Sequence, residues 1–278
     1  MEYHFEMAGL CTRLCTPGKI EISSRLRPFL MQPQEKTDCT IVLKMVKKLP
    51  QMSNFGAWHG PEYYDRREDA MRIFHCTTDH RTPFAVTVLL ENGNVEISVL
   101  PAYLFWFSGS SGIFNRIGLE TLLLQHQGLL LHASLIDKGI AFAGPSGAGK
   151  STQAALWAQY AGAEILNGDR AALRRTEEGW FAYGSPYAGT SGIYRRGCTP
   201  LKAIVVPGKG TENSLRRLSS TEAFARIYPE ISVQRWDREF TKKAADLCIC
   251  LLEEIPVYYL ECRPGESAVR LLQKGLAL

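Results

Sequence analysis

The chain has 278 residues, a length that suits one large domain or two modest ones. Hydrophobic residues make up 45% of it, charged residues 22% and aromatic residues 10%, and this ordinary globular composition argues against a disordered or fibrous protein. The net charge of +4, from 32 basic and 28 acidic residues, is too small to indicate nucleic-acid binding.

The N-terminus and the cysteines bear on the compartment of the protein. Glu2 and Glu6 stand where a secretory signal would be basic, and no apolar run approaches the ~18 residues that a membrane-spanning helix needs. The eight cysteines form no paired C-x-x-C framework, so we predict buried free thiols rather than a zinc site. Together these features predict a cytoplasmic protein that does not enter a membrane.

Residues 1–112 have the pattern of a mostly-β region. Short apolar segments are separated by turn residues, and ENGN at 91–94 carries the Asn-Gly signal of a β-hairpin. SGSSG at 108–112 has the composition of a short joint. Three segments rich in Val, Ile and Thr are predicted as strands: 40–46, 84–90 and 95–101.

Strands alternate with helices after residue 112, which predicts an α/β domain over residues 113–278. Residues 113–128 have a helical spacing, with Ile113, Ile117 and Leu124 on one stripe. Ser219 and Glu222 have the spacing of a capping box. The predicted strands are 129–136, 140–144, 163–169, 200–208 and 256–262, with a hairpin over 173–184. The predicted helices are 150–162, 223–231, 238–255 and 266–276.

The segment GPSGAGKST at 144–152 has the composition of a phosphate-binding loop. It matches the Walker A pattern G-x-x-x-x-G-K-[ST] and lies between a predicted strand and a predicted helix. In such a P-loop, backbone amides and the positive helix end surround the phosphates, the lysine adds a full charge, and the serine hydroxyl binds Mg²⁺. The alternative is a glycine-rich turn without a ligand. The expected nucleotide-binding residues are Gly144, Pro145, Ser146, Gly147, Ala148, Gly149, Lys150, Ser151 and Thr152.

A metal-bound triphosphate also needs a carboxylate, and Asp169 follows Lys150 by only 19 residues. Asp169 would end the predicted strand 163–169, at the edge where α/β sheets bind ligands. Ser151 and Asp169 are therefore the candidate metal ligands. The alternative is that Asp169 is a structural residue of the turn sequence NGD.

The segments LLLHASLIDKGIAFAGPSGAGKST and ILNGDRAAL resemble the nucleotide core of HPr kinase/phosphorylase and of the related ATP-dependent phosphoenolpyruvate carboxykinase. Later segments, from YGSP to VYYLECRPGESAVRLL, resemble uncharacterised bacterial HPr-kinase-like proteins, some of them associated with peptide modification. The resemblance implies an α/β fold with a P-loop core of the phosphoenolpyruvate carboxykinase/HPr kinase type and a mixed sheet. A smaller, mostly-β N-terminal region would precede this core.

The resemblance also implies roles for single residues. Lys150 and its loop would bind ATP and Mg²⁺, Asp169 would be either a metal ligand or the catalytic base, and His132 would lie near the reacting phosphate. The alternative for His132 is a core histidine that faces a strand neighbour. The chain departs from HPr kinase at Gly168-Asp169, where that family has two adjacent acidic residues, and at Thr152, where it has one.

An arginine often completes a phosphoryl-transfer site. Arg170 is expected to point away from Asp169 if the strand continues through both residues. We expect at least one of four others to reach the phosphate or the acceptor: Arg195, Arg196, Arg216 and Arg217.

These features favour an ATP- and Mg²⁺-dependent kinase that phosphorylates a hydroxyl, such as that of serine, in a protein or peptide. If Ser151 alone holds the metal, Asp169 is free to act as the general base, and this is the role that we predict. Residues 1–112 would help to bind the acceptor, and the resemblance raises the expectation of a homo-oligomer. The alternatives are a small-molecule kinase with the same core and a non-catalytic, nucleotide-gated binding module.

Overall fold

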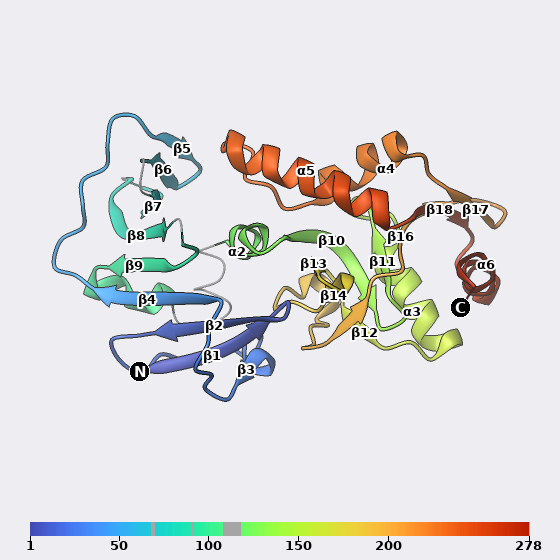
Figure 1. Ribbon diagram of the computed structural model, residues 1–278, viewed down its shortest axis with the longest axis horizontal. Helices are drawn as coiled ribbons and strands as arrows, with labels where there is room; N and C mark the ends of the chain where they lie inside the picture. Colours follow the sequence, from blue (N-terminus) through green and yellow to red (C-terminus); the bar gives the residue numbers. More distant parts are fainter. Residues whose placement is uncertain (68–69, 80, 91, 108–117, 278) are drawn as a thin grey trace. The chain divides into compact units, whose positions relative to one another are not determined.

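The protein is a strand-rich mixed α/β chain with two mixed sheets. It divides into two compact units, residues 1–122 and 123–278, which are described one at a time (Figure 1). The computed structural model describes residues 1–67, 70–79, 81–90, 92–107 and 118–277. The predicted boundary after residue 112 and the predicted joint 108–112 therefore lie outside the described residues, as do Ile113 and Ile117.

The N-terminal unit is built on a nine-stranded sheet in the order β3-β1-β2-β4-β9-β8-β7-β6-β5. Strand β4 is parallel to both of its neighbours, β2 and β9, and the other pairs are antiparallel. The strands are β1 Glu2–Met7, β2 Leu10–Cys15, β3 Leu30–Met31, β4 Cys39–Met45, β5 Ala57–His59, β6 Glu62–Arg66, β7 Ala70–Cys76, β8 Pro83–Leu90 and β9 Val95–Val99. Two 3₁₀ helices accompany them, η1 Arg27–Phe29 and η2 Pro101–Phe107.

The strands predicted for this unit are confirmed as β4, β8 and β9, and β8 and β9 form the expected antiparallel pair. In the turn between them the Leu90 N–H donates to the Asn94 carbonyl at 2.9 Å, and Gly93 has a φ of +82°, which favours glycine. Glu91 of this turn lies outside the described residues. The strand predicted over 95–101 ends at Val99, and Pro101 begins η2.

The C-terminal unit contains a sheet in the order β15-β14-β13-β10-β11-β16-β18-β17, and β12 also pairs with β10. Strands β11, β16 and β18 run parallel, and the other pairs are antiparallel. The strands are β10 Gly128–Ile136, β11 Ile140–Ala143, β12 Ile165–Asn167, β13 Arg170–Thr176, β14 Gly179–Tyr183, β15 Cys198–Pro200, β16 Ala203–Lys209, β17 Ser214–Arg217 and β18 Val257–Cys262. The helices are α3 Lys150–Ala161, η3 Gly189–Ser191, α4 Ser220–Ile227, η4 Tyr228–Glu230, α5 Arg238–Glu254 and α6 Glu266–Leu276, and α2 Leu119–Gln125 spans the division between the two units.

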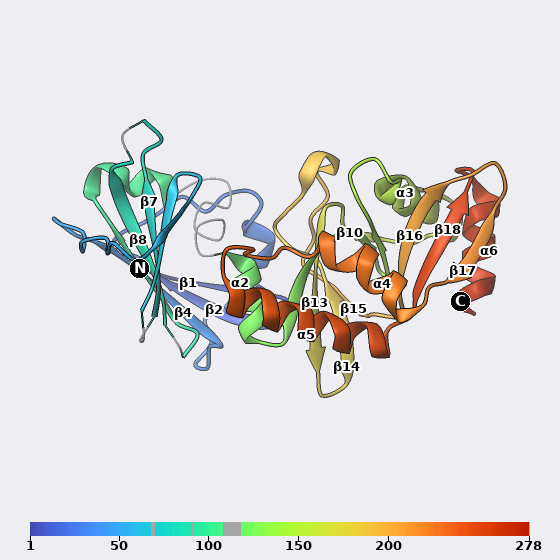
Figure 2. The same ribbon diagram turned by 90° about the horizontal axis from the view of Figure 1, so that it is seen from above.

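Helices cover both faces of this second sheet (Figures 1 and 2). Leu131 and Leu135 of β10 belong to one buried cluster, which includes Leu251 of α5 and residues of α4. Trp157 of α3 and Leu272 of α6 belong to another cluster, with the alternate residues of β11. The two clusters arise because successive side chains of a strand point to opposite faces.

Helices α3, α5 and α6 start and stop close to the predicted residues, whereas α4 ends four residues before the predicted end and, within the described residues, α2 covers only 119–125 of the predicted 113–128. Helix α3 begins at Lys150 and ends before Gly162, which adopts a left-handed conformation, and α6 spans the predicted 266–276. Both hydrogen bonds of the predicted capping box between Ser219 and Glu222 are present, so α4 starts at Ser220, earlier than predicted. The strand predicted over 163–169 is shorter, because β12 ends at Asn167.

All eight cysteines are free, and four of them are buried, as predicted: Cys39, Cys76, Cys248 and Cys262. Burial raises the pKa of the Cys39 and Cys248 thiols to about 12, so both remain protonated at neutral pH. Cys198 is exposed, unlike the prediction. Within the described residues, no helix combines the length and the apolar character that crossing a membrane requires.

Trp157 is the largest of the fully buried side chains, with 1% of its surface exposed. We predict that Trp157→Ala lowers the free energy of unfolding by about 3–5 kcal/mol, because it leaves a cavity between α3 and the sheet. Chemical denaturation measures this loss. Tyr160→Ala, on the exposed side of the same helix, is the matched control and should cost much less. Equal losses in the two variants would contradict this account of the core.

Candidate functional site

The glycine loop connects the end of β11 to the start of α3, as the sequence predicts. Gly144, Gly147 and Gly149 have φ angles of +144°, +79° and +102°, a region that residues with a Cβ rarely adopt. Gly149 also precedes the first turn of α3, and no side chain caps that helix end. The first amides of α3 are therefore available to an anion, and they add the positive end of the helix dipole.

Lys150 is buried, with 7% of its surface exposed, although it carries an ammonium group. Its Nζ donates to the carbonyl oxygens of Gly144 at 2.7 Å and Pro145 at 3.1 Å, so the side chain folds back over its own loop. Burial lowers the pKa of Lys150, and the negative charges of Glu230 and Asp169 oppose that shift. An anion bound at the loop would compensate the buried charge further.

The register of β10 places three other segments beside His132: the glycine loop, the start of β13 and the end of η4. Ala133 pairs with Ala143, so the loop that follows Ala143 begins beside His132. On the other edge of β10, His132 itself pairs with Arg170 of β13. Leu131 makes a bridge with Ile231, which places the end of η4 next to the same point. Segments far apart in sequence thus meet around one residue.

His132 lies between two carboxylates. Its Nδ1 is 2.9 Å from Glu230 Oε2, and its Nε2 is 3.8 Å from Asp169 Oδ1. An ionised carboxylate only accepts hydrogen bonds, so Nδ1 carries the proton in this arrangement. The imidazole is one-third exposed and contacts charged groups, which sets it apart from the core histidine that was the alternative.

Asp169 does not end a strand, so that part of the sequence prediction is wrong. The chain runs along β10 as β12, leaves the ladder for Gly168 and Asp169, and resumes pairing as β13. Buried Asn167 holds this interruption, because its Oδ1 accepts from the Asp169 N–H at 2.8 Å and the Arg170 N–H at 2.7 Å. Asp169 remains attached to the sheet, since its carbonyl accepts from the Ala133 N–H at 2.9 Å.

The same interruption changes the direction of Arg170. Arg170 Nε lies 3.9 Å from Asp169 Oδ2, whereas a continuous strand would have placed the two side chains on opposite faces. The guanidinium also covers the ring of Tyr187 at 5.2 Å from its centroid, and Nη1 donates to Ser232 Oγ at 3.3 Å. Arg170 is thus the arginine beside the carboxylate, and the sequence prediction had set it aside.

Two of the four arginines that were expected to reach the site have other contacts. Arg195 forms an ion pair with Glu164, and Arg216 binds Glu222 at 2.9 Å. These pairs have exposed side chains, so they contribute little to stability.

Glu230 is the residue of this cluster that sequence reasoning missed. It belongs to η4 and is separated from His132 by 98 residues, and its side chain is only 12% exposed. Nothing local in the sequence marks it, because the bridge between Leu131 and Ile231 is a non-local contact.

The residues of the loop suit a nucleotide with its metal ion. Pro145, Ser146 and Gly147 are exposed at the loop surface, and Ser151 and Thr152 are exposed in the first turn of α3. In the part of the chain that the structure describes, no three His, Cys, Asp or Glu side chains form a group that could hold a metal ion. A metal here would therefore depend on phosphate oxygens together with Ser151 and a nearby carboxylate.

Comparison with protein families finds no family model that matches the chain, and comparison with curated proteins finds no match either.

The contact between Gly189 and Asp169 gives a test of how the site is held. A Cβ on Gly189 would lie 2.8 Å from Asp169 Cγ, whereas a Cβ on Gly192 would meet nothing within 4 Å. Both glycines have a positive φ, +52° and +67°. We predict that Gly192→Ala costs about 1 kcal/mol of unfolding free energy from backbone strain. Gly189→Ala should cost clearly more, because Asp169 or η3 must move.

Thermal or chemical unfolding of the two variants measures the difference. If both variants lose the same stability, Asp169 does not pack against Gly189.

Proposed function

We propose that this protein is an ATP- and Mg²⁺-dependent kinase that transfers the γ-phosphoryl group to a hydroxyl of a protein or peptide, such as that of a serine. One observation carries the proposal: the Walker A loop, Lys150, His132, Asp169 and Glu230 converge on one point of the C-terminal unit. The antiparallel pair β10–β11 that enters the loop supports a core of the phosphoenolpyruvate carboxykinase/HPr kinase type.

The nucleotide would bind with its phosphates on the loop amides and the first turn of α3. Lys150 Nζ would exchange the carbonyls of Gly144 and Pro145 for oxygens of the β- and γ-phosphates, so its buried charge would gain a stronger partner. Ser151 would hold Mg²⁺, which when bound neutralises charge on the phosphates.

The acceptor hydroxyl would then approach the γ-phosphorus from the side of Asp169. The acceptor oxygen forms a bond to phosphorus, its proton passes to the Asp169 carboxylate, and the bond to the β-phosphate oxygen breaks, so that ADP leaves with the electron pair. Arg170, 3.9 Å from Asp169, is close enough to stabilise negative charge on the transferred group.

The cluster of His132, Asp169 and Glu230 favours phosphoryl transfer over nucleotide binding without transfer. A module that only binds a nucleotide needs the loop, Lys150 and Ser151, but it has no use for two carboxylates on either side of an imidazole. His132, Asp169 and Glu230 are not part of the phosphate-binding loop, and they have the chemistry of an acceptor site.

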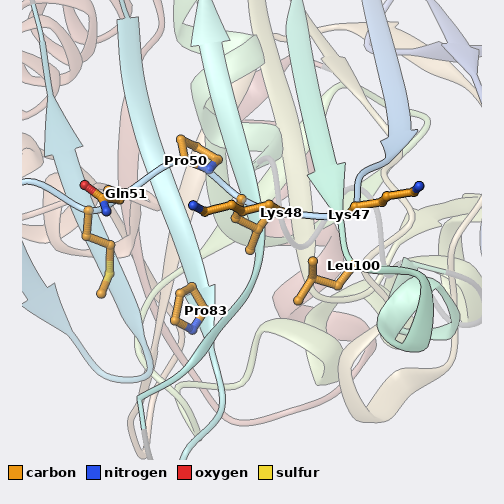
Figure 3. Close-up of a pocket in the computed structure, with 8 residues that line it drawn as sticks. Lys47, Lys48, Pro50, Gln51, Pro83 and Leu100 are labelled. Atoms are coloured by element: carbon orange, nitrogen blue, oxygen red, sulfur yellow. The ribbon is translucent and has the colours of Figure 1, made fainter.

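In the proposed function, a groove in the N-terminal unit would help to bind the polypeptide acceptor. It has a volume of about 510 Å³ and is lined by Lys47, Lys48, Leu49, Pro50, Gln51, Met52, Pro83 and Leu100. Figure 3 shows the ammonium groups of Lys47 and Lys48 pointing away from each other along this groove. Since its described lining is basic and apolar without an acidic residue, an acidic segment of the acceptor with apolar side chains fits it best.

Labelling with γ-³²P-ATP tests the proposed function. Purified protein with Mg²⁺ and a lysate of its own organism should place label on a polypeptide, and Lys150→Ala should reduce that labelling on the order of 100-fold. Lys243→Ala, which removes an exposed lysine of α5, is the matched control and should label normally. Label on a soluble metabolite would favour a small-molecule kinase. ATP binding without any transfer would favour a nucleotide-gated module.

A charge reversal tests the groove, with the labelled polypeptide as the acceptor. We predict that Lys47→Glu/Lys48→Glu raises the KM for that polypeptide on the order of tenfold and leaves the KM for ATP unchanged, because only acceptor binding uses the groove. Lys19→Glu/Lys36→Glu changes the charge of the same unit equally, at other exposed lysines, and should leave both constants unchanged. An unchanged acceptor KM in the first variant would remove the groove from the proposal.

A further inference from the structure

Backbone hydrogen bonds hold a carboxylate on each side of His132. The N–H of the residue that follows His132 donates to the Asp169 carbonyl at 2.9 Å, on the edge of β10 that pairs with β13. On the other edge, the carbonyl of Leu130 accepts from the N–H of Ser232 at 2.8 Å, two residues after Glu230. Asp169 and Glu230 are therefore fixed beside the ring by the sheet itself.

The two carboxylates contact the ring differently. Glu230 Oε2 lies 2.9 Å from Nδ1 of His132, which is a hydrogen bond, whereas Asp169 Oδ1 lies 3.8 Å from Nε2, which is longer than one. A neutral imidazole has one N–H, and an ionised carboxylate can only accept it, so Glu230 fixes the proton on Nδ1. Nε2 is left as a hydrogen-bond acceptor beside the carboxyl group of Asp169.

We infer that, if the protein is the kinase proposed above, Glu230 positions His132 so that Nε2 takes over the proton that Asp169 receives from the acceptor hydroxyl. Glu230 is then a positioning residue, because it acts through His132. This inference rests on the proposed function and deepens it, since it assigns a role to the imidazole and to the carboxylate of η4.

The proposed proton transfer balances in protons and in charge. The acceptor hydroxyl loses its proton to Asp169 as its oxygen bonds to phosphorus, and the resulting carboxylic acid passes this proton to Nε2 of His132. Asp169 becomes a carboxylate again, and His132 becomes an imidazolium, which the negative charge of Glu230 stabilises. Because the imidazole is one-third exposed, water can remove the proton before the next turnover.

The separation between Asp169 and Nε2 of His132 must shorten by about 1 Å for this step. Hydrogen bonds of catalytic groups are often long before the substrate binds and shorten in the reacting complex. Asp169 is not held back by a hydrogen bond to Arg170, because Oδ2 lies 3.9 Å from Arg170 Nε. The Glu230 side chain, with 12% of its surface exposed, has little freedom to release the ring.

NMR of the full chain labelled with ¹⁵N-histidine, without nucleotide or acceptor, tests where the proton lies. Wild-type His132 should carry a proton on Nδ1 and none on Nε2 at neutral pH, and His132→Gln identifies its signals among those of the six histidines. In Glu230→Gln the side-chain amide can donate to Nδ1, so the proton should move to Nε2, where Asp169 accepts it. A wild-type ring protonated on Nε2 or on both nitrogens, or an unchanged tautomer in Glu230→Gln, would overturn the inference.

Transfer to the labelled polypeptide measures the consequence of the tautomer. Glu230→Gln should lower kcat on the order of 100-fold and leave the KM for ATP unchanged, because Nε2 can no longer take the proton. In a chain that already carries His132→Gln, Glu230→Gln should lower kcat no further, whereas a purely structural role would add a separate loss. Glu253→Gln, at an exposed position of α5, is the matched control and should behave as the wild type.

His132→Gln alone is the second variant if Glu230→Gln folds poorly, because it leaves the sequence of η4 unchanged, and it should lower kcat by a similar factor. Wild-type kcat in either folded variant would overturn this inference and leave the proposed function standing. A wild-type protein that transfers no phosphoryl group would overturn the proposed function and this inference with it.

Discussion

The hydrogen-bonded ladder along β10 is the constraint on which the candidate site depends. Its pairing with β11 fixes where the glycine loop begins, its pairing with β13 fixes Arg170, and its bridge to Ile231 fixes η4. Backbone pairs of this kind are strongly specified where both faces of a strand are buried, because a shift by one residue would turn every side chain to the wrong face. β10 is such a strand, so His132 has one possible set of neighbours.

The second constraint is the positive charge of the buried Lys150 side chain. A buried ammonium is costly unless other charges offset it. Among the described residues, the hydrogen bonds of the Lys150 ammonium go to carbonyl oxygens alone, and the charges of Glu230 and Asp169 raise its pKa against the effect of burial. In the proposed function, a bound polyphosphate would offset the remaining cost of burying this ammonium.

Local signals explain which features could be predicted from the sequence. The glycine loop, the start of α3 and the capping box at Ser219 all depend on residues within a few positions of one another, and they are present as predicted. The strand predicted through Asp169 was too long, because the Asn167 side chain accepts hydrogen bonds from the backbone N–H groups of Asp169 and Arg170. The pattern of apolar residues in the sequence does not indicate such side-chain bonds. Glu230 could not be found from the sequence, since its contact with His132 depends on the non-local bridge between Leu131 and Ile231.

Packing around Gly168 explains why this chain lacks the two adjacent acidic residues that HPr kinase has at this point. In this chain the turn after β12 is closed over by η3, and Ser191 fills the space into which a side chain at 168 would project. The Asp169 carbonyl accepts a hydrogen bond from the Ala133 N–H, and its side chain packs against Gly189. The second carboxylate beside His132 is that of Glu230, the last residue of η4, and Ile231, which follows it, bridges to Leu131 of β10. The packing around position 168 therefore leaves no room for an acidic side chain directly before Asp169.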